Sequence, residues 1–205
     1  MRVLVACEFS GIVRDAFAAR GHDAWSCDLL PSDRPGKNHL IGDVRWWLKP
    51  VQGRARDPFN MPWDLMIAFP PCTYTCSSGL HWNTRRPERA ALTEAALAFD
   101  RELLDAPIPR IALENPIGCI SPRIRKPDQI VQPWMFGHPE SKATCLWLKN
   151  LPLLVPTEVL PLPASGRWSN QTASGQNRLG PSVDRWKLRS ATYAGIAKAM
   201  AEQWG

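Results

Sequence analysis

Five short strand-like runs, widely spaced along the chain, constrain its fold more than any other feature. They cover residues 2–6, 23–28, 63–69, 110–113 and 143–148, and most of them are continuously apolar. A strand that is buried on both faces has this composition, whereas a strand with one face in water alternates apolar and polar residues. Strands buried on both faces are typical of parallel sheets covered by helices. We therefore expect an α/β fold, with a mostly parallel sheet and helices on both faces.

Helical stretches separate these runs, as such a fold requires. One follows the first run and ends at Gly21, and another begins at Pro87, a residue that the first turn of a helix tolerates. The second stretch has a predicted apolar stripe of Leu92, Ala95, Phe99 and Leu103. The segment 30–39 is rich in turn-forming residues and is expected to be a loop. A third helix is predicted near the end of the chain, with one face formed by Tyr193, Ile196, Ala197, Met200 and Trp204.

Length and composition agree with a single domain over residues 1–205. A chain of 205 residues with 44% hydrophobic content can bury one core, and its 13 Gly and 20 Pro are too few for a low-complexity chain. The net charge of +6 suits a polyanionic partner, although many soluble proteins carry as much. No apolar run is long enough to span a bilayer, and the six residues before Cys7 leave no room for a signal peptide. We expect a cytoplasmic protein.

The six cysteines are expected to be free thiols. A chain with this much apolar content does not need disulfides, and no pair has the Cys-x-x-Cys spacing of a metal or redox motif. Cys72, Cys76 and His81 lie close in the sequence, but a fourth ligand at a plausible spacing is missing. We therefore predict no metal site and expect most of the thiols to be buried as small apolar groups.

Ligands of parallel α/β sheets bind beyond the carboxyl ends of the strands, so the residues after each run are the candidates for function. Cys72 follows the run 63–69 on a turn stiffened by Pro70 and Pro71, which can hold a reactive thiolate. Glu114 follows the run 110–113, where partial burial would raise the pKa of its carboxyl and let it donate a proton at neutral pH. Taken singly, either residue could be an ordinary loop residue.

The first two runs offer a different kind of site. Phe9, Ser10 and Gly11 form a turn between a strand and a helix, through which backbone can approach a cofactor, although the turn lacks the full Gly-x-Gly-x-x-Gly pattern. Asp28 closes the second run, where dinucleotide-binding folds place an acceptor for ribose hydroxyls. Asp43 follows a further loop and could accept a hydrogen bond from an adenine amino group. Either aspartate could instead be a cap or turn residue.

Read in order, these residues resemble the C5-cytosine DNA methyltransferase family, in the compact form encoded by phages and prophages. The resemblance spans residues 2–148 and 190–204, and its most specific part is the ordered pair Phe69-Pro70-Pro71-Cys72 and Glu114-Asn115-Pro116. Lys142 and Thr144 depart from the family, which places arginines there, and a Lys point charge does not replace a bidentate guanidinium. The other matching segments are Phe9-Ser10-Gly11, Asp28, Gly42-Asp43-Val44-Arg45, Pro139-Glu140-Ser141-Lys142-Ala143-Thr144 and Thr192-Tyr193-Ala194-Gly195-Ile196-Ala197.

The resemblance implies a Rossmann-like S-adenosylmethionine-dependent methyltransferase fold and methylation of cytosine at C5 in DNA. Cys72 would attack C6 of the base, Glu114 would protonate or hydrogen-bond N3, and Lys142 and Thr144 would lie beside the base. Because a base inside a duplex is out of reach of the thiol, the cytosine would be flipped out of double-stranded DNA. S-adenosyl-L-methionine would be bound by Phe9, Ser10, Gly11, Asp28, Asp43, Val44 and Pro70. DNA phosphates would be bound by Arg85, Arg86, Arg123, Arg125, Lys126, Arg178 and Arg185.

Two alternatives remain open. Residues 150–189 form a reduced, loop-rich insertion where larger members of the family carry a target-recognition domain, so the substrate could be cytosine in RNA or in a free nucleotide. The absence of arginine at positions 142 and 144 would also suit a catalytically inactive protein that binds cofactor or DNA. The presence of both Cys72 and Glu114 favours an active enzyme.

Overall fold

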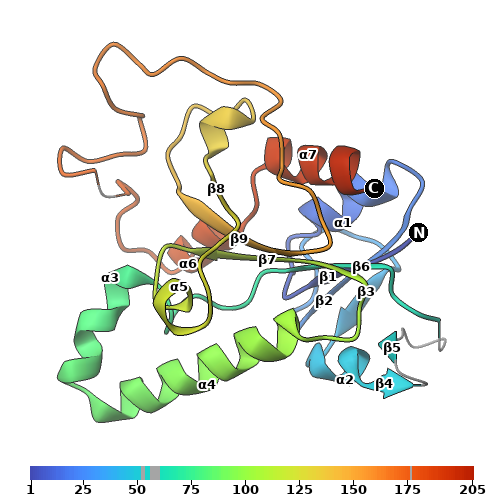
Figure 1. Ribbon diagram of the computed structural model, residues 1–205. Helices are drawn as coiled ribbons and strands as arrows, with labels where there is room; N and C mark the ends of the chain where they lie inside the picture. Colours follow the sequence, from blue (N-terminus) through green and yellow to red (C-terminus); the bar gives the residue numbers. More distant parts are fainter. Residues whose placement is uncertain (52–53, 56–60, 176) are drawn as a thin grey trace.

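The computed structural model of the protein describes residues 1–51, 54–55, 61–175 and 177–205 and contains a seven-stranded sheet (Figure 1). Its strands are β1 (Arg2–Ala6), β2 (Asp23–Asp28), β3 (His39–Ile41), β6 (Leu65–Ala68), β7 (Arg110–Pro116), β8 (Gln129–Val131) and β9 (Thr144–Lys149). Their order across the sheet is β3-β2-β1-β6-β7-β9-β8, and β9 alone runs antiparallel to its neighbours within this sheet. A separate ribbon pairs β4 (Pro50–Val51) with β5 (Arg54–Ala55). The predicted fold class, an α/β fold with a mostly parallel sheet and helices on both faces, is confirmed.

Helices cover both faces of the sheet (Figure 1). α1 (Ile12–Ala18) and α7 (Ala194–Trp204) pack against each other on one face, and α4 (Pro87–Leu104) and α2 (Arg45–Leu48) cover the other. Alternate residues of β1 point into the two layers: Val3 and Val5 join the layer of α1 and α7, while Leu4 and Ala6 join that of α4. Because both layers exclude water, the central strands are continuously apolar.

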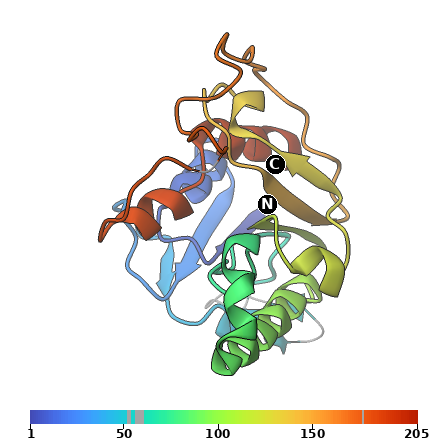
Figure 2. The ribbon, with the colours of Figure 1, turned by 90° about the vertical axis from the view of Figure 1, so that its left-hand side faces the viewer.

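Three short helices lie at one end of the sheet: α3 (Ser77–Leu80), α5 (Ile120–Arg123) and α6 (Arg185–Ser190) (Figures 1 and 2). α3 follows the turn after β6 and α5 follows β7, so this end holds the carboxyl ends of the parallel strands. Two 3-10 turns, η1 (His81–Thr84) and η2 (Pro133–Met135), complete the regular structure of the described residues. Between β9 and α6 the described residues form isolated bridges but no helix or longer strand.

Two strand predictions are corrected. The segment 30–39, predicted as loop throughout, ends at the start of β3, which pairs in parallel with the last residues of β2. An edge strand of three residues is too short to leave a pattern in the sequence. β7, predicted to stop at Leu113, continues to Pro116 because β9 pairs with it from Ile111 to Pro116. β6 pairs with β7 only as far as Leu113, so residues 114–116 of β7 pair with β9 alone. A strand with a neighbour on one side only tolerates proline.

The predicted apolar stripe of α4 is also corrected. Pro87 begins the helix as predicted, but the buried residues are Thr93, Leu97, Asp100 and Leu103, whereas Leu92 is 44% exposed. Thr93 is buried because its hydroxyl donates a hydrogen bond to the carbonyl oxygen of Tyr74 at 2.9 Å. The spacing of apolar residues does not reveal a polar contact of this kind. As a result, the buried face of α4 includes Thr93 and not the neighbouring Leu92.

The predicted helices at the two ends of the chain are confirmed as α1 and α7. α7 buries Ile196, Met200 and Trp204, and it starts at a close approach of two backbones. A Cβ at Gly195 would lie 2.0 Å from the carbonyl oxygen of Phe136, so this position requires glycine. All six cysteines are free thiols. None of the described helices is long and apolar enough to cross a membrane, and no group of three metal-ligating side chains occurs among the described residues.

Candidate active site

The carboxyl ends of β1, β2, β6 and β7 lie at one edge of the sheet because these strands are adjacent and parallel. This edge brings the predicted residues together in two groups. Near the end of β1, Ala6 pairs with Cys27, so Asp28 lies beside that strand end. The backbone N–H of Gly42 donates to the carbonyl oxygen of Asp28 at 2.9 Å, which brings Asp43 to the same edge. Beyond β6 and β7, Cys72 lies within electrostatic reach of Glu114 and Lys142.

Cys72 lies exposed on the turn that follows β6. Its carbonyl oxygen closes the turn by accepting hydrogen bonds from the backbone N–H groups of Cys76 at 3.0 Å and Thr75 at 3.2 Å. The neighbouring thiol of Cys76 and burial both raise the pKa of the Cys72 thiol.

Asn115 holds this turn from the neighbouring strand. Its side chain is 1% exposed, its Nδ2 donates to the carbonyl oxygen of Pro70 at 3.1 Å, and its Oδ1 accepts from the hydroxyl of Thr75 at 3.0 Å. Both sides of the Cys72 turn are thereby anchored to β7, the strand that carries Glu114. Asn115 belongs to the Glu114-Asn115-Pro116 segment singled out in the sequence, where no separate role was predicted for it. An amide next to a candidate acid at a strand end is the signal that could have indicated one.

Glu114 lines a small cavity between β7, β9 and the start of α7, together with Phe69, Lys142, Thr144, Tyr193 and Ile196. Burial raises the pKa of its carboxyl, while the charge of Lys142 and the neighbouring Thr144 hydroxyl lower it. A carboxyl with a raised pKa holds its proton closer to neutral pH and can act as an acid there.

Lys142 connects this cavity to α6. Its Nζ donates a hydrogen bond to the carbonyl oxygen of Arg189 at 2.8 Å and lies 5.8 Å from the centre of the Tyr193 ring. The Thr144 hydroxyl donates to the carbonyl oxygen of Lys142 at 3.2 Å. The charge of this ammonium lowers the pKa of both the Glu114 carboxyl and the Cys72 thiol.

The side chains of Glu8 and Ser10 build the turn after β1. The buried Glu8 carboxylate accepts hydrogen bonds from the backbone N–H of Val13 at 2.7 Å and from the hydroxyl of Ser10 at 3.1 Å. Gly11 has φ of +69°, and a Cβ there would lie 2.7 Å from the guanidinium of Arg14, so the turn requires glycine. No role was predicted for Glu8 from the sequence. The side chains of Glu8 and Ser10 form their hydrogen bonds inside the turn. The backbone of the turn is therefore the part that is available to contact a ligand.

The other predicted cofactor residues differ in their surroundings. Asp28 is half-buried, burial raises the pKa of its carboxyl, and the backbone N–H of Leu30 donates to it at 2.9 Å. The guanidinium of Arg45 donates a hydrogen bond from its Nε to Oδ2 of Asp43 at 2.9 Å. This contact lowers the pKa of the Asp43 carboxyl. Val44 and Pro70 are buried. Asp28 is therefore the acceptor better placed for a ligand.

α6, which the sequence analysis did not predict, packs on the turn after β1. The ring centres of Phe9 and Trp186 lie 5.5 Å apart, and the Lys187 ammonium lies 5.8 Å from the Phe9 ring. Lys187 also forms an ion pair with Asp33 at 2.6 Å. Since the carbonyl oxygen of Arg189 in the same helix holds Lys142, α6 extends from the predicted cofactor turn to the Glu114 cavity.

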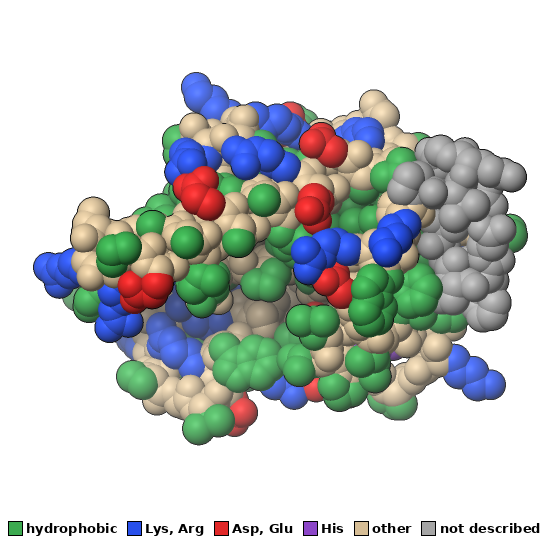
Figure 3. Space-filling view, turned by 90° about the horizontal axis from the view of Figure 1, so that it is seen from below, with side chains coloured by type: hydrophobic (Ala, Val, Ile, Leu, Met, Phe, Trp, Pro, Cys, Tyr) green, Lys and Arg blue, Asp and Glu red, His purple; other side chains and the backbone are tan. Residues whose placement is uncertain are grey.

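The predicted phosphate-binding residues do not form one group. Arg85 and Arg86 both lie over the Trp82 ring, at 5.6 and 5.3 Å from its centre. Arg123 and Arg125 each form an ion pair with a carboxylate of the chain. The face that carries α4 shows the same arrangement, with Lys and Arg side chains interspersed with Asp and Glu (Figure 3). The remaining members are the exposed Lys126 and Arg178, and Arg185 of α6.

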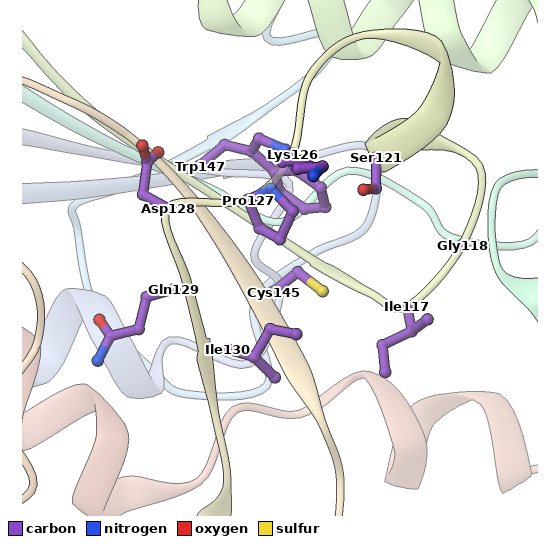
Figure 4. A pocket seen from close by; sticks show the side chains of 10 residues that line it. All are labelled: Ile117, Gly118, Ser121, Lys126, Pro127, Asp128, Gln129, Ile130, Cys145 and Trp147. Carbon is purple, nitrogen blue, oxygen red and sulfur yellow. The ribbon is translucent and has the colours of Figure 1, made fainter.

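A larger cavity of about 410 Å³ lies on the other face of β9 (Figure 4). Its lining includes Ile117, Lys126, Ile130, Cys145 and Trp147, and it contains neither Cys72 nor Glu114. Thr144 lines the Glu114 cavity and Cys145 lines this one, because successive residues of a strand point to opposite faces. The candidate catalytic residues Cys72 and Glu114 therefore lie outside the larger cavity.

No protein-family model matches the chain, and no curated protein matches its sequence. Among solved structures, the chain is similar to a crystal structure described as a proposed DNA modification methyltransferase encoded within a prophage of E. coli. The two share 17% sequence identity with a TM-score of 0.47. The similarity covers 81% of this chain and 53% of the other, so the chain spans about half the length of that protein.

Proposed function

We propose that the protein is an S-adenosylmethionine-dependent methyltransferase that methylates cytosine in DNA at C5 through a covalent bond between Cys72 and C6. The observation that carries the proposal is that Asn115, the neighbour of Glu114 on β7, hydrogen-bonds to Pro70 in the turn of the exposed Cys72, at the carboxyl edge of a Rossmann-like sheet. A thiol nucleophile, a carboxyl with a raised pKa and a nearby cation suit addition to a cytosine ring.

The chemistry follows from the reactivity of the base. Cytosine C5 is a poor nucleophile because the ring is aromatic. The Cys72 thiolate forms a bond to C6 while Glu114 gives a proton to N3, so the ring becomes an enamine with a nucleophilic C5. Lys142 balances the negative charges that Glu114 and Cys72 carry during these steps. Once C5 carries the methyl group, a water molecule takes the C5 proton, and the C6–S bond breaks to release the Cys72 thiolate. N3 returns its proton to the Glu114 carboxylate, which restores the neutral aromatic ring and the acid.

S-adenosyl-L-methionine, when bound, supplies the methyl group. The residues at the ends of β1 and β2 fit this group: Asp28 offers a half-buried carboxylate to the ribose hydroxyls, and the turn formed by Phe9, Ser10 and Gly11 offers backbone. Asp43, Val44 and Pro70 would complete the site. Asp43 would contact the adenine alongside Arg45, with which it is already paired.

DNA is the proposed substrate, with the target cytosine flipped out of the duplex. Arg85, Arg86, Lys126, Arg178 and Arg185 would bind phosphates, while Arg123 and Arg125 would do so only by leaving their ion pairs. We infer that residues 1–205 act as one methyltransferase domain and that residues 150–189 take the place of a target-recognition domain. Such a short segment reads few bases. Binding should weaken steeply with salt because phosphate contacts displace counterions.

Transfer of tritium from labelled S-adenosylmethionine tests the proposal. Duplex DNA, RNA and dCTP are incubated separately with the protein and with its Cys72→Ser, Glu114→Gln and Cys119→Ser variants. We expect label in DNA, its loss in Cys72→Ser and its near-loss in Glu114→Gln. Cys119→Ser is the matched control, because this buried cysteine lies outside the proposed site.

The other outcomes separate the alternatives. If label appears only in RNA or dCTP, that molecule and not DNA is the substrate. If no substrate is labelled, the protein is an inactive binding protein. Duplex DNA that contains 5-fluorocytosine should trap a covalent adduct, and peptide mapping should place the adduct on Cys72. Methyl transfer without a trapped adduct would show that Cys72 is not the nucleophile.

A further inference from the structure

One asparagine ties the long segment between β9 and α6 to the surroundings of the Glu114 cavity. The side-chain amide of Asn170 pairs with the backbone of Ser141: its Oδ1 accepts from the N–H at 3.0 Å, and its Nδ2 donates to the carbonyl oxygen at 2.9 Å. The same Nδ2 donates to Oε2 of Glu140 at 3.3 Å. The amide thus uses both of its hydrogens and its oxygen on one short stretch of chain.

This stretch leads directly into the Glu114 cavity. Oε2 of Glu140 also accepts a hydrogen bond from the hydroxyl of Tyr193 at 2.5 Å, and Lys142 follows Ser141 in the chain. Tyr193 and Lys142 both line the cavity. The part of the chain just before α6 lies at the same end of the sheet as α3 (Figures 1 and 2). The asparagine is therefore one contact away from two residues of the cavity wall.

Residues 168–178 form a hairpin around this asparagine. An isolated antiparallel bridge joins its two arms, and the N–H of Arg178 donates to the carbonyl oxygen of Asn170 at 2.8 Å. At the start of the hairpin, the buried Trp168 stacks on Trp134, with ring centres 6.4 Å apart and an angle of 11° between the rings. The hairpin thus has one apolar anchor, Trp168, and one polar anchor, Asn170.

The exposed part of this hairpin suits a DNA backbone. Residues 173–175 near its tip are small and exposed, so a phosphate backbone can approach them closely. Arg167 and Arg178 flank the hairpin, both are exposed, and neither forms an ion pair with another residue of the described chain. Guanidinium groups that are not paired within the protein can bind phosphates without first breaking an ion pair.

We propose that Asn170 is the positioning residue that docks the hairpin 168–178 beside the Glu114 cavity, and that the docked hairpin forms one side of the DNA-binding surface. The choice of DNA rests on the proposed function, whereas the docking contacts do not. Because the hairpin is held on the residue before Lys142, DNA that contacts its arginines lies next to the cavity.

Limited digestion of the intact protein with trypsin tests the docking without any substrate. In Asn170→Ala, cleavage after Arg167 and Arg178 should be about 10-fold faster than in the parent, because cleavage follows the population of the undocked hairpin and three hydrogen bonds that oppose undocking are lost. Sites in α4 should be cut at the parent rate, which a misfolded variant would not show. Asn38→Ala is the control, since its Nδ2 also bonds to a backbone carbonyl oxygen, that of Ala24 in β2. Equal cleavage of the hairpin in Asn170→Ala and in the parent would overturn the proposal.

A second substitution separates docking from a general loss of structure. Asn170→Asp keeps the shape of the side chain but places a second carboxylate against Glu140, so cleavage of the hairpin should be at least as fast as in Asn170→Ala. Adding Glu140→Gln removes one of the two charges and supplies an N–H donor. The double variant should therefore be cut about 3-fold more slowly than Asn170→Asp. No recovery in the double variant would overturn the contact between the two side chains.

Binding of a fluorescent DNA duplex, followed by anisotropy at several salt concentrations, tests the DNA-binding surface. We expect Asn170→Ala to raise the Kd about 10-fold, and Arg178→Ala to reduce the slope of log Kd against log salt by about 1, the value for one phosphate contact. Arg20→Ala, on an exposed residue of the turn after α1, is the control and should change neither. Parent-like binding in both Asn170→Ala and Arg178→Ala would overturn the proposal. If the parent neither binds nor methylates DNA but the digestion shows the expected difference, the docking stands and the proposed function fails.

Discussion

The side-chain amide of Asn115 donates a hydrogen bond to the carbonyl oxygen of Pro70 at 3.1 Å, which ties the strand of Glu114 to the turn of Cys72. The same side chain accepts a hydrogen bond from the buried hydroxyl of Thr75. The proposed acid and the proposed nucleophile are therefore tied to each other by one residue that has neither role.

Replacement of Asn115 by alanine should disconnect the turn. It leaves the Thr75 hydroxyl and the Pro70 carbonyl oxygen buried without their partner, so we expect the free energy of unfolding to fall by about 2–3 kcal/mol. Urea denaturation measures this loss. Adduct formation with 5-fluorocytosine DNA should fall at least about 10-fold under conditions where the variant is folded, because misplacement of reacting groups is costly. Asn177→Ala, on an exposed residue, is the control and should change stability by less than about 0.5 kcal/mol.

Gly118 should tolerate no side chain. A Cβ at this position would lie 2.0 Å from the carbonyl oxygen of Thr75, a backbone atom that cannot move without breaking the bridge to Cys76. We expect Gly118→Ala to lower the free energy of unfolding by about 2 kcal/mol or more, measured by urea denaturation. Gly180→Ala is the matched control, since no heavy atom lies within 4 Å of its added Cβ. Equal stability of the two variants would mean that the contact between the two loops is looser than described.

The sheet was predictable because strands that are buried on both faces have a continuously apolar sequence. Residues 2–6 and 110–113 are apolar on both faces since helices cover both, and that pattern is visible in the chain alone. β3 was missed because three residues at a sheet edge carry no such pattern, and the buried face of α4 was misplaced because Thr93 is buried through a hydrogen bond.

The candidate site was predictable to the extent that its residues follow strands. Cys72 and Glu114 stand directly after apolar runs, so the rule that ligands bind at strand ends was enough to single them out. Asn115 and α6 act through contacts with residues far away in the sequence, such as the hydrogen bond between Lys142 and Arg189. Contacts of this kind depend on the folded arrangement and leave no local pattern.

Asp100 should make stability depend on pH. It is buried in α4, its Oδ2 has no hydrogen-bond partner among the described residues, and burial raises the pKa of its carboxyl to about 7. The folded protein therefore binds a proton that the unfolded chain has released, so this group's contribution to stability is lost as the pH rises from about 4 to about 7. Asp100→Asn removes the buried charge and should be more stable than the parent at pH 8 by about 2–4 kcal/mol. Urea denaturation at pH 5 and pH 8 checks this, with the exposed Asp105→Asn as control. A parent-like pH dependence in Asp100→Asn would contradict the assignment.

Trp186 of α6 should contribute to cofactor binding without touching the reacting atoms. Its ring packs on Phe9 at 5.5 Å between centres, and an aromatic pair of this kind contributes about 0.5–1.5 kcal/mol. If Phe9 shapes the cofactor turn, Trp186→Ala should raise the Kd for S-adenosylmethionine by about 2- to 10-fold, measured by titration calorimetry. Lys187→Ala should have a smaller effect, because its ion pair with Asp33 is solvent-exposed and such pairs contribute about 0–1 kcal/mol. Leu188→Ala, on a 63% exposed residue of the same helix, should leave the Kd unchanged. A Kd that is unchanged in Trp186→Ala as well would show that α6 covers the turn after β1 without supporting it.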